Sequence, residues 1–225
     1  MARTFKRERG KTRSLVLHSA SKLFIERGYS NTRIKDIAAD SGVGYNEIFR
    51  MFIDKDNLLS QLIDLVIEHQ FNFTEEYLKD KTNDKLLYYA FESVLQLYIA
   101  ESSEHIREMY SVSYSLPHTS HKIYEFITEK LENVFKEYLP EYETKDFYEL
   151  EIACAGIVRG FIIYPCNMYF TMDRKVSRLL KTILKIYEVP KERIEETIKF
   201  VNQFDMKNLA KEVLDTLFEY IINRT

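Results

Sequence analysis

Residues 13–58 read RSLVLHSASKLFIERGYSNTRIKDIAADSGVGYNEIFRMFIDKDNL, and this stretch decides the fold of the N-terminal region. The pattern predicts a short amphipathic helix over about 33–40, a tight turn at 41–44 and a second short helix over about 45–52. Gly42 stands where the backbone needs a positive φ to reverse direction. These features predict a helix-turn-helix, whose second helix enters the major groove of DNA.

Longer helices are expected on both sides of this unit. The preceding helix is predicted over about 11–27, with Gly28 as its C-terminal stop. Thr32 has the side chain of a good N-cap for the 33–40 helix. Asp54 is expected to cap a further helix that runs to about Lys79 and joins the N-terminal unit to the rest of the chain.

Charge divides the chain into a basic head (residues 1–55) and an acidic body (residues 56–225). The head holds 12 Lys and Arg against 6 Asp and Glu, a net charge of +6, whereas the body holds 20 against 29, a net charge of −9. Such asymmetry is expected when one end of a protein meets phosphate. The first residues are the most basic, which is consistent both with a disordered solvated arm and with an arm that contacts DNA. The basic residues of this arm are Arg3, Lys6, Arg7, Arg9, Lys11 and Arg13.

An ordered set of residues in the head resembles the N-terminal domain of TetR-family transcriptional regulators. The spacing matches without gaps over about 45 residues. The resemblance implies an all-α fold with an N-terminal helix-turn-helix DNA-binding domain, 1–55, and a C-terminal helical ligand-binding and dimerisation domain, 56–225. The matching residues are Leu23-Phe24, Gly28-Tyr29, Thr32, Ile37-Ala38, Gly42-Val43, Phe49, Phe52, Lys55 and Leu58.

The resemblance and the chemistry of the side chains together predict the DNA contacts. The start of the 33–40 helix presents free backbone N–H groups to a phosphate, and Thr32 can add a hydroxyl. By resemblance, Lys55 contacts phosphate. In the 45–52 helix, Asn46 suits adenine and Arg50 suits guanine or phosphate. The predicted DNA-binding residues are Thr32, Arg33, Gly44, Tyr45, Asn46, Phe49, Arg50 and Lys55.

Three positions depart from the family pattern. Gly44 replaces the usual Ser or Thr, Glu47 stands where a small hydroxyl residue is common, and Phe49 replaces a frequent phosphate-contacting tyrosine. These changes leave open an alternative, a helical interaction protein with a weakened DNA-binding head. Binding to double-stranded DNA is the reading that we favour, because the basic charge and the motif agree.

The body is expected to be helical throughout, because the whole chain has only 6 Gly and 4 Pro. The most apolar helix, 84–100, should lie at its centre. By resemblance, the helices 144–170 and 206–223 would pair with their copies in a four-helix bundle of a homodimer, and 171–204 would be an insertion. One further helix is expected to end at about 116, before Pro117. The remaining expected helices are 120–139, which ends before Pro140, 173–188 and 191–204.

The apolar stretch 152–170 is expected to be a core or interface helix and not a membrane span. Arg159 near its middle would cost about 2.5–3.5 kcal/mol in a membrane. The region 1–30 lacks the features of a signal peptide, and two cysteines 12 positions apart, Cys154 and Cys166, suit a reducing compartment. A cytoplasmic location without a membrane partner is therefore expected.

Aromatic residues of the body predict a ligand pocket. Clustered tyrosine hydroxyls suggest a cavity with polar walls. Arg159 is expected either to pair with Glu151 or Glu92, or to meet an anionic ligand. Pro165 leaves one helical carbonyl unbound, which predicts a kink nearby. The predicted ligand-binding residues are Tyr98, Tyr110, Tyr114, Arg159 and Tyr164.

The sequence offers no Gly-rich phosphate loop, no set of metal ligands and no Ser/Cys–His–acid group. We therefore expect no enzyme activity, no catalytic residue, no metal and no cofactor. The functional hypothesis is a dimeric repressor that leaves its operator when a small, largely apolar or aromatic effector binds.

Overall fold

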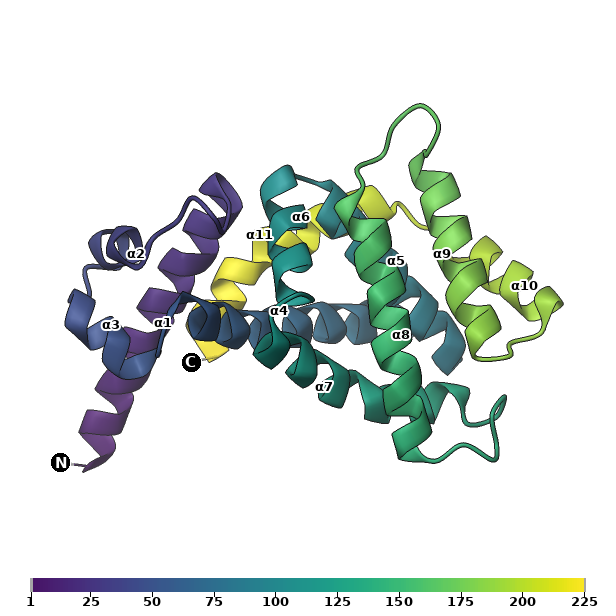
Figure 1. Cartoon of the computed structure of the whole chain (residues 1–225), viewed down its shortest axis with the longest axis horizontal. Helices are drawn as coiled ribbons and strands as arrows, with labels where there is room; N and C mark the ends of the chain where they lie inside the picture. The colour runs from purple at the N-terminus through teal and green to yellow at the C-terminus, as the bar shows by residue number, and fades with distance from the viewer. Residues whose placement is uncertain (1, 225) are drawn as a thin grey trace.

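The computed structural model describes residues 2–224, and it describes their side chains over 10–223. Within 2–224 all regular structure is helical, which confirms the predicted all-α class (Figure 1). The helices are α1 (Ala2–Arg27), α2 (Ile34–Ser41), α3 (Tyr45–Met51), α4 (Lys55–Leu78), α5 (Lys85–Glu101), α6 (Glu104–Ser113), α7 (Pro117–Phe135), α8 (Thr144–Ile163), α9 (Met172–Ile186), α10 (Lys191–Val201) and α11 (Met206–Arg224).

The helix-turn-helix lies at one end of the molecule, where α2 and α3 pack beside α1 (Figure 1). A small apolar core holds the three helices together, and the first turns of α4 complete it. Helix α4 then continues from this core into the body. The buried residues at the centre of the core are Phe24, Ile37, Ile48, Phe52 and Leu58.

The helix ends of the head follow local backbone chemistry. Gly28 and Gly42 have φ values of 85° and 69°, so both occupy the left-handed region that glycine tolerates. The Asp54 side chain accepts a hydrogen bond from the N–H of Asn57 at 2.7 Å and caps α4 as predicted. The prediction for Thr32 as an N-cap was wrong, because α2 begins at Ile34 and Arg33 is its N-cap.

Three other predicted helix boundaries differ from the structure. Helix α1 begins at Ala2, so the basic N-terminal segment continues the helix instead of forming an irregular arm. Pro117 does not stop a helix but stands at the first position of α7, where a missing N–H costs nothing. Helix α8 ends at Ile163 and not at 170, because the residue before Pro165 is driven out of the helical region.

Helix α5 forms the centre of the body, as its apolar sequence predicted. It packs against α4, α6, α7, α8, α9, α10 and α11. Helices α9 and α10 contribute to this same core through buried residues such as Leu180, Ile183 and Ile194, so the segment 171–204 is an integral part of the body.

The two helices expected to form a dimer bundle occupy different places. Helix α8 packs chiefly on α7, α6 and α9, whereas α11 runs back along α5 and α4 to α1 (Figure 1). The apolar stripe of α11 is buried inside its own chain at Leu209, Val213, Leu217 and Ile221. This stripe therefore serves intramolecular packing and holds the body to α1.

Among the described residues, no helix is both long enough and apolar enough to cross a membrane.

Candidate DNA-binding face and ligand cavity

One face of α3 is open to solvent. Ile48 is fully buried and anchors the helix, while the residues on the other side are exposed. The rings of Tyr45 and Phe49, one turn apart, meet edge to face with 4.9 Å between their centroids. The structure thus brings together in one surface the predicted residues Gly44, Tyr45, Asn46, Phe49 and Arg50.

The start of α2 is arranged differently from the prediction. Arg33 is exposed, but its backbone N–H donates to the Asp36 carboxylate at 2.9 Å. Thr32 is completely buried, and its hydroxyl donates to the carbonyl oxygen of Gly28 at 2.8 Å. The hydroxyl of Thr32 therefore holds the end of α1 and is not presented to a phosphate.

Lys55 is partly buried and binds the protein itself. Its ammonium group donates to the carbonyl oxygens of Tyr29 at 3.0 Å and Thr32 at 3.2 Å. It also lies 4.0 Å from the centre of the Tyr29 ring, whose hydroxyl donates to Asp56. Burial lowers the pKa of Lys55. An ammonium has three donors, so Lys55 has one N–H left while it fixes the segment between α1 and α2 through the other two.

Helix α6 touches the head directly. The Glu108 carboxylate accepts a hydrogen bond from the backbone N–H of Ser30 at 3.0 Å, and the His105 ring lies 3.1 Å from the carbonyl oxygen of Ile25 through Nδ1. A Cβ added at Gly28 would lie 2.5 Å from Oε2 of Glu108. The end of α1 is therefore packed tightly on α6 of the body.

The body contains a cavity of about 460 Å³ between α4, α5, α7 and α8. This volume lies in the range of sites for small organic ligands. Aromatic and aliphatic side chains make most of the wall, and polar groups are concentrated at a few positions. The apolar part of the wall includes Phe71, Tyr88, Tyr89, Tyr114, Leu131 and Val158.

Glu92 lies in the cavity wall and is held by a polar network. Its carboxylate accepts from Gln70 Nε2 at 2.6 Å and from the hydroxyl of Thr74. The hydroxyl of Tyr110 donates to Oε1 of Gln70 at 3.0 Å and extends the network to α6. Burial raises the pKa of Glu92 to about 7, although the hydrogen bonds from Thr74 and Gln70 oppose this shift.

Glu151 is a second buried carboxylate in the same wall. It is only 6% exposed, and burial raises its pKa to about 8. Within residues 2–224, no hydrogen bond or ion pair joins this carboxylate to another side chain or to the backbone. A buried carboxylate without a partner is costly when charged, so the site favours the protonated form.

The five predicted ligand residues do not form one pocket. Tyr114 lines the cavity, where its hydroxyl accepts a hydrogen bond from Gln96 at 3.1 Å. Tyr110 lies behind the wall and reaches the cavity only through Gln70. Tyr98 packs against the main core outside the cavity lining, and the Tyr164 side chain is 66% exposed.

Arg159 also lies outside the cavity lining, and its predicted pairing with Glu151 or Glu92 is not present. Its Nε donates to the hydroxyl of Ser115 at 2.9 Å and, at 3.4 Å, to the carbonyl oxygen of Ser111. The side chain is only partly buried, so the guanidinium does not require a carboxylate partner. Helix α8 instead turns Glu151 inward and Arg159 toward the end of α6.

Sequence reasoning named Glu92 and Glu151 only as partners of Arg159 and missed them as cavity residues. The available signal was an acidic residue inside each of two strongly apolar helices. Burying such a group needs either a partner or a cavity, which makes the position informative.

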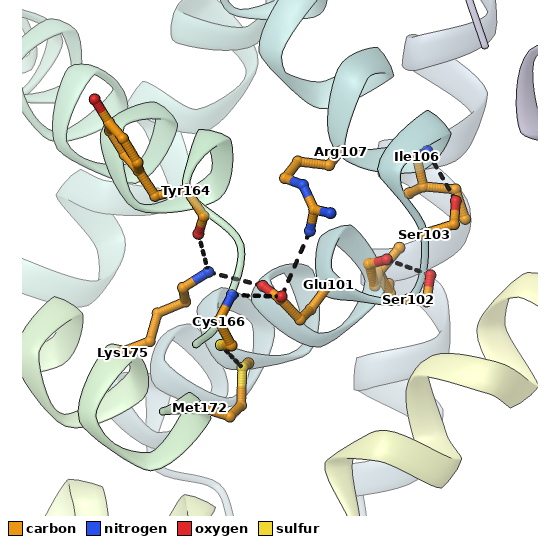
Figure 2. A network of polar contacts seen from close by, with 10 residues as sticks. Glu101, Ser102, Ser103, Ile106, Arg107, Tyr164, Cys166, Met172 and Lys175 are labelled. Carbon is orange, nitrogen blue, oxygen red and sulfur yellow. Dashed lines mark hydrogen bonds and ion pairs between the residues drawn. The ribbon is translucent and has the colours of Figure 1, made fainter. Parts of the chain in front are cut away.

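A separate polar network fixes the loop after α8 (Figure 2). The ammonium of Lys175, 1% exposed, lies 2.7 Å from Glu101 and donates to the carbonyl oxygen of Tyr164 at 2.6 Å. Glu101 also accepts from the N–H of Cys166 at 2.7 Å and pairs with Arg107 at 3.5 Å. The Tyr164 ring points away from this network, so only its backbone takes part (Figure 2).

Comparison with known proteins concerns mainly the head. Residues 16–62 match the family described as bacterial regulatory proteins, tetR family. The HTH-type transcriptional regulator Mb3439c of Mycobacterium bovis and the HTH-type transcriptional repressor Rv3405c of Mycobacterium tuberculosis are each 45% identical to this chain over 49 residues. The aligned part is 22% of this chain and 26% of each relative, so the chain matches about a quarter of their length.

A crystal structure of a gamma-butyrolactone receptor (ArpA like protein) is similar over 92% of this chain and 99% of that chain, with a TM-score of 0.45 and 16% identity. The family match coincides with the helix-turn-helix core formed by α1, α2, α3 and the start of α4. Residues 16–62 of this chain are therefore the helix-turn-helix domain of the tetR family of bacterial regulatory proteins.

Proposed function

We propose that this protein is a homodimeric transcriptional repressor that binds double-stranded DNA and is released by a small effector. In this proposal the head, residues 1–55, binds the operator, and the body, residues 56–225, binds the effector and forms the dimer. The protein then acts in the cytoplasm, where bacterial DNA is found. One of the relatives, Rv3405c, is a transcriptional repressor by name, which supports the choice of repression.

DNA recognition is assigned to the exposed face of α3. Asn46 and Arg50 have the donors and acceptors that read adenine and guanine in a major groove. Tyr45 and Phe49 offer an apolar edge that suits a thymine methyl group. Arg33 and Lys55 contribute positive charge near the phosphates, and the head as a whole carries a net charge of +6.

In the proposed dimer, the two recognition helices would reach half-sites about 34–36 Å apart on DNA. The outward side of α8 is the best candidate for the contact. It carries exposed Ile152, Ala153 and Gly156, and a Cβ at Gly156 or Gly160 would meet nothing within 4 Å. The apolar stripe of α11 is already used within the chain, so α11 is the weaker candidate.

The observation that carries the proposal is that two helices connect the head either with the cavity wall or with the polar network behind it. Helix α4 begins with Lys55 in the head and lines the cavity with Gln70, Phe71 and Thr74. Helix α6 binds Ser30 through Glu108 and reaches the cavity network through Tyr110. An effector that prefers one arrangement of these helices would shift the population of the DNA-binding state.

A genomic pull-down tests this function. The purified protein is incubated with fragmented DNA and washed at two salt concentrations, and the retained fragments are sequenced. A palindromic site that survives the higher salt supports a specific dimeric regulator. Salt-labile retention of all fragments alike would contradict it and favour the alternative, a helical interaction protein whose head holds phosphate without reading bases.

A further inference from the structure

The ionisable groups of the cavity are not equivalent. Its lining includes the acidic residues Glu75, Glu92 and Glu151 and the basic residues Lys85 and Lys130. Glu75 and Lys85 are exposed. The Lys130 ammonium lies 4.0 Å from the centre of the Phe71 ring and lowers the pKa of Glu92, so its charge acts at the Glu92 end of the cavity. For Glu151, by contrast, burial alone raises the pKa.

Glu92 and Glu151 therefore have different roles. Glu92 already accepts hydrogen bonds on both carboxylate oxygens, from Gln70 and Thr74, which ties α5 to α4. Glu151 is 94% buried, lines the cavity and has no partner among the described residues. Its acceptor capacity is thus available to a molecule inside the cavity, and a positively charged group would satisfy it best.

The aromatic wall supports the same charge. Tyr88, Tyr89 and Tyr114 line the cavity together with Glu151. Aromatic faces attract cations, and this attraction grows when the cation is removed from water. A ligand with an apolar body and one cationic centre therefore suits both the walls and the carboxylate.

We propose that the effector cavity binds a small lipophilic cation, an aromatic or alkyl ammonium ion, with Glu151 as its counterion. This inference rests on the proposed function, since it names the chemical class of the effector. Glu151 then binds the cation as an ionised carboxylate and gives up its proton to solvent when the cation enters. Binding of a cation is thereby coupled to the release of one proton.

This coupling predicts a pH dependence. A cation of permanent charge must displace the proton from Glu151, whose pKa is about 8, so its affinity rises with pH below 8 and levels off above it. The expected gain between pH 6.5 and 8.5 is more than about tenfold. The titratable groups whose pKa Glu151 raises are Tyr89, Tyr114, Cys154 and Tyr187. The ionisable groups Glu75, Glu92, Lys85 and Lys130 share the cavity wall with it. Of these, Glu92 also titrates near pH 7 and must be tested separately.

The probe is thioflavin T, a permanently cationic aromatic dye, and its matched control is the uncharged analogue that lacks the ring N-methyl group. Both are titrated into the full-length protein without DNA, and binding is followed by calorimetry at pH 6.5 and 8.5. The variants are Glu151→Gln, Glu92→Gln and Glu149→Gln, the last an exposed glutamate on the same helix. Thermal unfolding establishes that each variant is folded.

The wild type is expected to bind the cation at least tenfold more tightly than the neutral analogue at pH 8.5. Glu151→Gln should remove most of this preference and flatten the pH dependence, whereas Glu149→Gln should change neither. No binding of the cation by the wild type, equal binding of both probes, or an unchanged preference in Glu151→Gln would each overturn the proposal. If Glu92→Gln removed the preference for the cation and Glu151→Gln did not, the counterion would be Glu92, and the proposal would also be overturned.

The outcome is independent of the DNA experiment. If the wild type binds a specific operator but does not prefer the cation, only the proposed chemical class of the effector is refuted. If the wild type prefers the cation but selects no specific DNA site, the cation-binding cavity is supported and the repressor function is refuted.

Discussion

The Nζ atom of Lys55 lies 3.2 Å from the carbonyl oxygen of Thr32, and this contact joins the first turn of α4 to the segment before α2. Both residues were predicted as separate phosphate contacts, yet they form one intramolecular unit. A second bond from Lys55 to the carbonyl oxygen of Tyr29 completes it. The position of α2, and with it that of α3, therefore depends on the side chain of Lys55.

Replacing Lys55 by Met tests this structural role. The variant keeps much of the apolar stem but loses both hydrogen bonds, so the free energy of unfolding should fall by about 1–2 kcal/mol. Denaturant unfolding measures the change. Lys35→Met, on the exposed side of α2, should stay within about 0.5 kcal/mol of the wild type. Equal losses in the two variants would refute the role assigned to Lys55.

The two glycines of positive φ provide a matched pair. A Cβ at Gly42 would meet nothing within 4 Å, so Gly42→Ala should cost only the backbone strain, about 1–2 kcal/mol. Gly28→Ala should cost about 0.5–1.5 kcal/mol more, because displacing Glu108 breaks its bond to Ser30. Adding Glu108→Ala to Gly28→Ala should remove the strain from the contact. If the loss of stability in the double variant equals the sum of the losses in the two single variants, this explanation is wrong.

The head was more predictable than the body for a physical reason. Gly42, Asp54 and the apolar spacing of Ile37 and Ile48 act through local backbone chemistry, which a sequence states directly. The role of the Thr32 hydroxyl was predicted wrongly, because the hydroxyl bonds to Gly28 at the end of the preceding helix. The N-cap of α2 is the adjacent residue, Arg33. Such choices depend on tertiary packing.

Substitutions on α3 should separate base reading from charge. Asn46→Ala and Arg50→Ala should each weaken binding to the selected operator by about 1–3 kcal/mol and weaken binding to random DNA much less. Arg33→Ala should weaken both DNAs similarly and reduce the salt dependence by about one ion. Fluorescence anisotropy at several salt concentrations measures these changes, with Lys199→Ala on the far helix α10 as the control. Uniform losses in all α3 variants would argue that α3 does not read bases.

Stability should depend on pH through Glu151. Its folded pKa of about 8 lies above the ordinary value of 4.5, so the folded state binds a proton that the unfolded state releases. The resulting stability is complete below about pH 4.5 and is lost as the pH rises toward 8. Glu151→Gln lacks this loss, so it should be more stable than the wild type at pH 8.5, and its advantage should shrink at pH 5.5. Denaturant unfolding at both values, with Glu149→Gln as the control, checks the sign.

The cavity was only partly predictable. Sequence periodicity places aromatic residues on the right helices, but the rotation of each helix decides which of them line the cavity. Tyr114 faces the cavity and Tyr164 does not, because α8 ends before Pro165 and releases Tyr164 into a loop. Glu151 and Arg159 are about 80° apart around α8 and about 12 Å apart along it. Glu151 therefore reaches the cavity, whereas Arg159 reaches Ser115 beyond the end of α6.

The 24 residues of α4 form one continuous rod of about 36 Å, with Lys55 at one end and cavity residues such as Gln70 further along. Rotation of such a rod by about 5° moves its far end by about 3 Å, close to the spacing between successive base pairs. In the proposed mechanism, a small rotation of α4 at the cavity would therefore move the head by a distance on the scale of one base-pair step. The length of α4 would then determine how far the head moves for a given rotation at the cavity.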